Sequence, residues 1–347
     1  MNTKVYTLEN ENNFNNAVNE VSELIKSGGI AVVPTETVYG LAADGMNEKA
    51  VAKIFAAKGR PSDNPLIFHI ADFDMIYDIA SEIPEKAKKL TNKFWPGPLT
   101  VILPKKSHVP HISTGGLESA AIRMPSHPFT RELIRKCGAA LTAPSANLSG
   151  KPSPTEFSHC YDDMNGRVDA IVDGGSCKVG LESTVISFLE ETPVLLRPGA
   201  VTPAQIEEVI GEIKVAEAVL KELPGNEKTL SPGLKYKHYS PNADVFIVKG
   251  SFENYKKFVE NIGKERVFGL VFDGEGERLS IPCFEYGDNQ GGELQAHRLF
   301  NGLRELDKMG AKIVYARCPA ADGIGLAVYN RLIRAAAFQI IDLESDN

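Results

Sequence analysis

The segment Lys58-Gly59-Arg60-Pro61-Ser62-Asp63-Asn64-Pro65-Leu66 places two cations two residues apart around a glycine. It follows a helical pattern and leads into an expected strand over Leu66–Ile70. Fixed positive charges and backbone N–H groups in such a loop can hold a phosphate chain without the usual Gly-Lys-Ser/Thr loop. The alternative is an ordinary helix end, where a lysine suits the helix dipole and Gly and Pro terminate the helix.

Four other polar segments carry groups that can bind an anion. Hydroxyls are concentrated in Pro34–Gly40 and Thr142–Gly150, each of which follows an expected strand. Arg123 lies inside an apolar strand and therefore needs an anionic partner, which is either a protein carboxylate or a ligand. Arg197 ends a further strand. Together with Arg60 these residues gather cations and hydroxyls at strand ends of one α/β domain, where such sheets bind ligands, and so predict an anionic ligand.

Several common chemistries are excluded by the sequence. It contains no G-x-x-x-x-G-K-[ST] phosphate loop, no zinc-ligand spacing and no G-x-S-x-G nucleophile elbow. The nearest dinucleotide signature, Gly323-Ile324-Gly325, lacks Gly or Ala at its sixth position, which is Val328. A nicotinamide site is therefore not expected.

The composition predicts a soluble, cytoplasmic protein of two domains. The chain has 347 residues, 43% of them hydrophobic and 24% charged, which suits full globular cores. A formal net charge of −7 argues against coating nucleic acid by bulk charge. The five cysteines are scattered and odd in number, as expected of reduced thiols. Neither a secretory segment nor a membrane span is expected.

The first 210 residues alternate short β-rich runs with helical ones, which predicts an α/β layer around a largely buried sheet. Strands are expected at Ile30–Pro34, Leu66–Ile70, Thr100–Leu103, Ala120–Met124, Ala139–Thr142, Ala170–Val172, Thr184–Phe188 and Val194–Leu196. Helices are expected at Asn47–Lys58, Phe129–Lys136 and Pro203–Ile210.

The pattern changes after residue 211, which predicts a catalytic domain over 1–211, a linker over 212–243 and a smaller α/β domain over 244–347. Lys214–Leu223 suits a short helix, and two Pro-Gly breaks follow it. The last part has a Rossmann-like β–α–β–α order. Strands are expected at Asp244–Lys249, Val267–Phe272 and Ile313–Ala316, and helices at Phe252–Asn261, Glu293–Met309 and Leu326–Gln339.

Several motifs in this order resemble those of the YrdC-like family. They are Lys-x-Arg-x-x-x-Asn-Pro-Leu, Pro-Thr-Glu-Thr-Val-Tyr-Gly-Leu, Arg-Met-Pro and Ala-Pro-Ser-Ala-Asn-x-Ser-Gly. The segment Ser231–Pro241 and the ending Gly-Leu-Ala-Val-Tyr-Asn-Arg-Leu-Ile-Arg-Ala-Ala are similar to those of its longer members, the threonylcarbamoyl-AMP synthases. The resemblance implies an N-terminal twisted mixed sheet with flanking helices and a C-terminal Rossmann-like α/β domain.

The resemblance also implies an activity, that of a nucleotidyltransferase. Such enzymes combine L-threonine, bicarbonate and ATP, with Mg²⁺, into threonylcarbamoyl-AMP and pyrophosphate. A downstream threonylcarbamoyl-transferase complex then modifies tRNAs that read A-starting codons. This chemistry gains from positioning and charge neutralisation and needs no protein nucleophile, in agreement with the residues found.

Carried over by motif, the resemblance assigns roles to individual residues and none to a protein metal ligand. Catalytic roles fall on Lys58, Arg60 and Arg123. Threonine would contact Thr37, His69, Arg123, Ala143 and Ser183. ATP would contact Lys58, Arg60, Asn64, Ser119, Ser145, Asn147, Ser153, Arg197 and Tyr236. The linker with Tyr236 would act as a lid that excludes water. For His69, a neutral core histidine on a strand is the alternative.

Two rival functions belong to other classes. A YrdC-like domain can bind double-stranded RNA by shape without a reaction, which leaves weak RNA binding open, although the net charge disfavours it. Related domains also transfer carbamoyl groups from carbamoyl-phosphate. Those enzymes are longer and carry zinc-finger and acylphosphatase-like segments, and neither is seen in this sequence.

Overall fold

The computed structural model describes residues 2–219, 221, 239–263 and 265–344. These residues divide into two compact units. The first unit holds the described residues up to 221 except 150–152, and the second holds 150–152 together with the described residues from 239 onward. Every helix in this part of the chain is too short or too polar to cross a bilayer.

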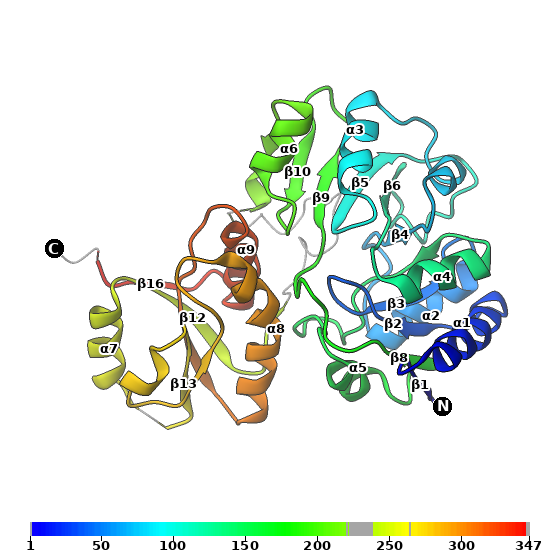
Figure 1. Cartoon of the computed structure of the whole chain (residues 1–347). Helices are drawn as coiled ribbons and strands as arrows, with labels where there is room; N and C mark the ends of the chain where they lie inside the picture. Colours follow the sequence, from blue (N-terminus) through cyan, green and yellow to red (C-terminus); the bar gives the residue numbers. More distant parts are fainter. Residues whose placement is uncertain (1, 220, 222–238, 264, 345–347) are drawn as a thin grey trace. The chain divides into compact units, whose positions relative to one another are not determined.

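The first unit is built on one mixed sheet of 11 strands, in the order β1-β8-β2-β3-β7-β4-β6-β5-β9-β10-β11 (Figure 1). Its strands are β1 Lys4–Thr7, β2 Ala31–Val33, β3 Gly40–Asp44, β4 Ile67–His69, β5 Leu99–Pro104, β6 Ser119–Arg123, β7 Leu141–Thr142, β8 Ala170–Asp173, β9 Thr184–Ser187, β10 Val194–Arg197 and β11 Lys214–Val215. Its helices are α1 Glu11–Lys26, α2 Glu48–Lys58, α3 Glu85–Phe94, α4 Pro128–Cys137, α5 Phe157–Met164 and α6 Pro203–Ile210, with short 3₁₀ turns η1 Phe73–Asp78 and η2 Glu217–Val219.

Strand alternation sends apolar side chains to both faces of the β1-to-β7 half of this sheet. Ala31 and Val33 of β2 pack in one cluster with α1 and α4. Val32, between them, packs on the other face with α2 and α5. A strand covered on both faces is expected to be apolar throughout, as β2 is.

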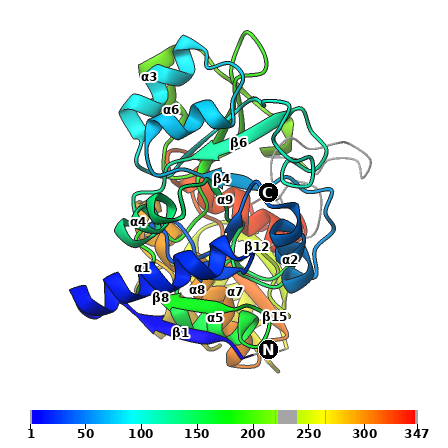
Figure 2. The ribbon, with the colours of Figure 1, turned by 90° about the vertical axis from the view of Figure 1, so that its right-hand side faces the viewer.

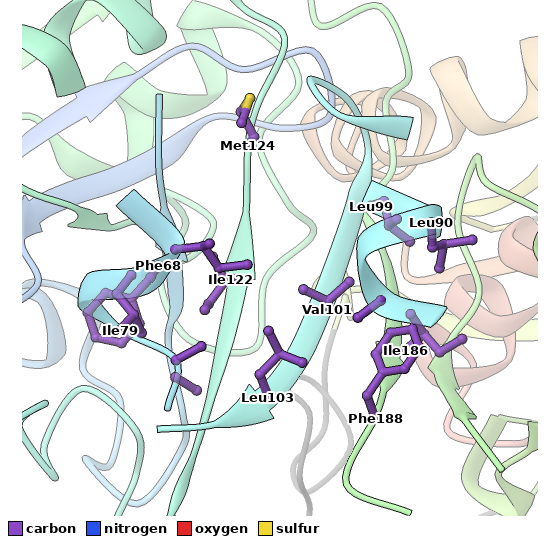
Figure 3. Close-up of a cluster of buried hydrophobic side chains, with 14 of the residues drawn as sticks. Phe68, Ile79, Leu90, Leu99, Val101, Leu103, Ile122, Met124, Ile186 and Phe188 are labelled. Carbon is purple, nitrogen blue, oxygen red and sulfur yellow. The ribbon is translucent and has the colours of Figure 1, made fainter. Parts of the chain in front are cut away.

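The other half of the sheet is covered by α3 and α6, which lie side by side in both views (Figures 1 and 2), with α3 packed against β5. Figure 3 shows the buried cluster that forms between them and the strands. Its members include Leu90 of α3, Val101 of β5, Ile122 of β6 and Ile186 of β9. This core holds β6 and β5 rigidly, and these two strands carry Arg123 and Thr100.

The second unit is a five-stranded, all-parallel sheet in the order β14-β13-β15-β12-β16. Its strands are β12 Asp244–Lys249, β13 Val267–Val271, β14 Cys283–Glu285, β15 Ile313–Arg317 and β16 Ile340–Asp342, and its helices are α7 Phe252–Glu260, α8 Gly292–Lys308 and α9 Gly325–Ala335, with a 3₁₀ turn η3 at Gly276–Arg278. Figure 1 shows α7 on one face of this sheet and α8 and α9 on the other. The expected fold class, a mixed sheet with flanking helices plus a Rossmann-like unit, is confirmed.

One element was predicted wrongly. Lys214–Leu223 was expected to form a short helix, but β11 pairs in parallel with β10 and the η2 turn follows it. The Lys214 amide donates to the Pro193 carbonyl at 2.9 Å, and the Ala216 amide donates to the Leu195 carbonyl at 3.0 Å. These two bonds complete the edge of the sheet. These tertiary bonds outweigh a weak local helix preference. Residues 222–238 of the expected linker lie outside the described residues.

Candidate functional site

Strand register in the first unit brings three polar side chains into one row. His69 of β4 and Thr100 of β5 both lie directly opposite Arg123 of β6. Residues directly opposite on neighbouring strands share a face of the sheet. The row continues to Ser183, which precedes β9 and whose Oγ lies 2.7 Å from Oγ1 of Thr100. The structure therefore brings together His69, Arg123 and Ser183, three of the residues expected around threonine, and adds Thr100.

The Arg123 guanidinium is buried, at 4% exposure, and has a protein carboxylate as its partner. Its Nη2 donates to Oε1 of Glu36 at 2.6 Å, its Nη1 to Oγ1 of Thr37 at 2.8 Å and its Nε to the Gly97 carbonyl at 3.4 Å. Of the two partners left open by the sequence, the protein one is thus present. A guanidinium has about five N–H donors, so these three bonds leave one on each Nη for a ligand carboxylate.

The loop after β2 presents Glu36 and Thr37 to the arginine. Oγ1 of Thr35 accepts from the amides of Thr37 (3.1 Å) and Val38 (3.2 Å), a local turn that serine and threonine favour. The second oxygen of Glu36 accepts from the Ser126 amide at 3.1 Å, just past the end of β6. The Pro-Thr-Glu-Thr sequence therefore fixes an acceptor on each side of Arg123.

His69 is buried and neutral. Burial, followed by the nearby charge of Arg123, lowers its pKa to about 3. Its Nδ1 lies 3.1 Å from the Ile67 carbonyl, which can only accept, so the ring proton is on Nδ1 and Nε2 is an acceptor. A strand histidine held in this way can accept a hydrogen bond from an ammonium group but is a weak base.

Ser183 is held from its other side by Arg197, the last residue of β10. Nε of Arg197 donates to the Ser183 carbonyl at 3.0 Å, and Nη2 donates to the Ser183 hydroxyl at 3.2 Å. Arg197 is 5% exposed. The hydroxyl of Ser183 thus lies between Thr100 and Arg197, which joins the expected threonine side to the expected ATP side.

Lys58 ties the end of α2 to the loop that follows β7. Its Nζ donates to the carbonyls of Ser145 and, at 2.7 Å, of Asn147, and its own carbonyl accepts from the Ser149 amide at 2.9 Å. Ser145 Oγ donates to the Asn147 side chain at 2.6 Å. Gly59, at φ +63°, closes α2 in the left-handed conformation that a side chain disfavours. Lys58 therefore shapes the Ser145–Asn147 loop.

The remaining expected ATP contacts differ in their surroundings. Asn64 is 2% exposed, and neither Nδ2 nor Oδ1 of its amide has a hydrogen-bond partner among the described residues. Such an orphaned buried amide is costly unless a ligand or water pairs with it. Ser153 donates to the buried Glu182 carboxylate. Ser119 begins β6, about 13 Å from Arg123 at the other end, and is not brought to the row. Arg60 follows α2 directly rather than ending a strand.

Ala143 keeps only part of its hydrogen-bonding capacity for a ligand. Its amide donates to the Ile67 carbonyl at 3.1 Å, which leaves its carbonyl as the available backbone group. The neighbouring Thr142 hydroxyl is fully buried and has no hydrogen-bond partner in the described ranges. Tyr236 lies outside the described residues.

Sequence reasoning missed three members of this cluster. Glu36 could have been found, because a strand arginine needs an anion and a glutamate lies in the neighbouring motif. Glu182 and Thr100 gave no such signal: a glutamate in a loop and a threonine in an apolar strand are both ordinary. Within the described ranges no three His, Cys, Asp or Glu side chains are grouped as metal ligands would be.

Two family models match the chain. One, described as "Telomere recombination" and labelled Sua5_yciO_yrdC, covers residues 23–199. The other, described as "Threonylcarbamoyl-AMP synthase, C-terminal domain", covers residues 201–337.

Two curated proteins named threonylcarbamoyl-AMP synthase are similar over most of their length. One is from Pyrococcus abyssi, 44% identical over 91% of this chain and 93% of the relative. The other is from Bacillus subtilis, 44% identical over 93% of each. A crystal structure of P. abyssi Sua5 complexed with L-threonine matches with a TM-score of 0.89 and 40% identity, and covers 99% of both chains.

Proposed function

Because this chain belongs to the two-domain, YrdC-like Sua5 family, we propose that it is a threonylcarbamoyl-AMP synthase and acts as a nucleotidyltransferase. It would combine L-threonine, bicarbonate and ATP into threonylcarbamoyl-AMP, pyrophosphate and water. The product would serve N6-threonylcarbamoyladenosine modification of tRNAs reading A-starting codons, through a downstream transferase complex. The observation that carries the proposal is the buried polar row centred on Arg123, in a fold whose P. abyssi relative was solved with L-threonine.

Threonine would bind along this row. The two remaining Nη donors of Arg123 suit the α-carboxylate, and Glu36 keeps the guanidinium neutralised before the ligand arrives. Nε2 of His69 would accept from the threonine amine, and the Thr100–Ser183 hydroxyl pair would face the rest of the amino acid. The low pKa of His69 makes it an acceptor rather than the base, so the amine proton would pass to bicarbonate or to a triphosphate oxygen.

Two bond-forming steps follow from this arrangement. The threonine nitrogen attacks the carbon of bicarbonate, and water leaves; if bicarbonate has already lost water to give CO₂, the nitrogen adds to CO₂ and only a proton leaves. A carbamate oxygen then attacks the α-phosphorus of ATP, and pyrophosphate leaves with the electron pair of the broken P–O bond. Neither step needs a protein nucleophile, so the chain contributes by positioning and by neutralising charge.

ATP would lie against the Lys58-shaped loop, with Arg197 and the Asn64 amide as its charged and neutral contacts. Glu36 and Glu182, the buried carboxylates of the cluster, are bonded to Arg123 and Ser153. They are therefore poorly placed to bind a cation, and Mg²⁺ would enter as the Mg-ATP substrate, held by phosphate oxygens and water. The proposed lid, 212–243 with Tyr236, rests on the family resemblance alone.

The test is pyrophosphate release from Mg-ATP, with L-threonine and bicarbonate omitted in turn and the adenylate detected by mass. We expect release only when both are present, together with a product of the mass of threonylcarbamoyl-AMP. Release without threonine, or salt-sensitive RNA binding with no nucleotide turnover, would instead mean that this scaffold serves another function.

A further inference from the structure

The second unit contains a cavity of about 460 Å³ that no part of the proposed synthase reaction uses. It lies beyond the carboxyl ends of three adjacent parallel strands. Lys249 and Arg317 are the last residues of β12 and β15, and Phe272 directly follows β13; all three line the cavity. A volume of this size is within the range of about 300–1,000 Å³ that small-molecule sites occupy.

The topology of the unit explains why a cavity forms at this point. Neighbouring strands β12 and β15 send their chains to opposite faces of the sheet, to α7 and to α9 (Figure 1). In open α/β sheets, a crevice opens outside the carboxyl ends of two such strands, and ligands bind in it. Gly250, at φ +132°, makes the turn from β12, and a Cβ there would lie 3.2 Å from Leu343. A glycine at this position therefore allows the tight turn between β12 and α7.

Arg317 forms the charged floor of the cavity. It is 6% exposed, and its Nε donates to both oxygens of Glu275, at 3.2 and 3.1 Å. Its Nη1 donates to the Gly250 carbonyl at 2.6 Å. Nη2 makes no hydrogen bond in the described part of the chain. The guanidinium is therefore fixed by the protein on one side and still offers donors on the other.

Two further sources of positive charge surround this arginine. The Lys249 ammonium has no hydrogen bond or ion pair within the described ranges. Helix α7 starts at the cavity, where Ser251 caps the amide of Asn254 and leaves the first two helical amides without an intrahelical acceptor. Such amides and the helix dipole favour a phosphate group. Of the carboxylates in the wall, Glu275 is neutralised by Arg317, and Glu344 is exposed.

We propose that this cavity binds a small molecule that carries a phosphate group, with the phosphate at Lys249, Arg317 and the N-terminus of α7. The volume exceeds that needed for phosphate alone, and Phe252 and Phe272 line it as apolar surface. The ligand is therefore of about nucleotide size, with an organic body beside these rings. The proposal concerns the second unit by itself and does not depend on the synthase reaction.

Cys318 lines the same cavity and supplies a local probe. The experiment measures the alkylation rate of Cys318 in the full-length chain by peptide mass spectrometry, at rising concentrations of inorganic phosphate, AMP and adenosine. Burial raises the pKa of the Cys318 thiol, so labelling is slow and is followed above neutral pH. Cys137, a partly buried thiol of the first unit, reports any change in reagent reactivity. Sodium chloride at matched ionic strength controls for screening.

We expect phosphate and AMP, but not adenosine, to slow Cys318 labelling. At ten times the dissociation constant the rate should fall about tenfold, because only about a tenth of the sites are then empty. Lys249→Gln should abolish the protection, whereas Lys257→Gln, an exposed lysine of α7, should keep it. Equal protection by sodium chloride, no protection by phosphate or AMP, or full protection in Lys249→Gln would overturn the proposal.

Discussion

Replacing Arg123 by methionine tests both the structure of the buried ion pair and the proposed threonine site. Methionine keeps the apolar stem and most of the volume but removes the guanidinium. Glu36, at 7% exposure, would then be a buried carboxylate whose one remaining hydrogen bond, among the residues described, comes from the Ser126 amide. Removing one partner of a buried ion pair costs about 3–5 kcal/mol. We therefore expect the free energy of unfolding to fall by about that amount.

The effect on threonine binding follows from the donors that remain on Arg123. Two N–H groups are available to a ligand carboxylate once the bonds to Glu36, Thr37 and Gly97 are counted. Hydrogen bonds to charged groups contribute at least about 1.5 kcal/mol each, so their loss removes about 3 kcal/mol. This corresponds to a roughly 100-fold weaker threonine affinity, since each 1.4 kcal/mol is a factor of ten. The affinity for ATP should change little.

A double variant separates the two effects. Glu36→Met/Arg123→Met removes the orphaned charge, and a buried pair replaced by apolar residues is often neutral for stability. The unfolding free energy should therefore recover, while the threonine affinity should not. Arg167→Met, at an exposed arginine of the same unit, is the matched control and should behave like the unmodified chain. Urea denaturation gives the stabilities, and titration calorimetry gives the affinities for L-threonine and ATP.

Either of two results would refute this reasoning. Threonine affinity that returns in the double variant would mean that the single variant had lost only its local structure. An equal loss of ATP affinity would mean that Arg123 contacts the nucleotide and that the threonine end has been misplaced.

Three further predictions concern the same unit. The folded pKa of His69, about 3, lies below the ordinary 6.5, so its stabilising effect is present above pH 6.5 and is lost on acidification. About 1.4 kcal/mol should be lost by pH 5.5, and His69→Gln should remove this part of the pH dependence measured by urea denaturation. Lys58→Met should cost roughly 2 kcal/mol or more and raise the KM for ATP, because the carbonyls of Ser145 and Asn147 lose a buried donor; unchanged thermal stability would contradict this. Asn64→Ala breaks no side-chain hydrogen bond in the part of the chain that the structure describes, so its unfolding free energy should change by less than about 1 kcal/mol while pyrophosphate release falls; normal turnover would exclude a ligand contact.

Helices and strands could be predicted from the sequence where the residues that determine them lie within or next to the element itself. Pro203–Ile210 was predicted to the residue from its Thr202-Pro203 start, and in the structure Thr202 and Gln205 form a capping box there and Gly211 ends the helix. Lys214–Leu223 failed because its conformation depends on the free edge of β10, about 20 residues earlier in the chain. The long helix α1 was not foreseen, because its first half reads as a polar, Asn-rich segment. Its buried face becomes evident only once α4 packs against it.

The candidate site divides in the same way. Residues that are unusual in their setting, such as an arginine in an apolar strand, could be assigned to the site from the sequence. The residues that bond to them could not in general be identified. Lys58 donates to main-chain carbonyls, which every residue possesses, so no pattern of side chains distinguishes Ser145 and Asn147 beforehand. Thr100 joins the row only through the register of β5 against β6. Register is a tertiary property that follows from the packed core in Figure 3.

The same contacts explain how such a site can act without a nucleophile. Each of three cations, Arg123, Lys58 and Arg197, is already bonded to protein acceptors that fix its direction. A flexible cation would have to give up hydration and side-chain freedom when an anionic substrate arrives, whereas these have done so on folding. The protein acceptors use only some of the N–H donors of Arg123. The other N–H donors are therefore held in fixed directions on the buried face of the sheet. Charge that develops on a carbamate or a phosphoryl group would then meet donors that need no reorganisation, and it is this that lowers a barrier in the absence of covalent chemistry.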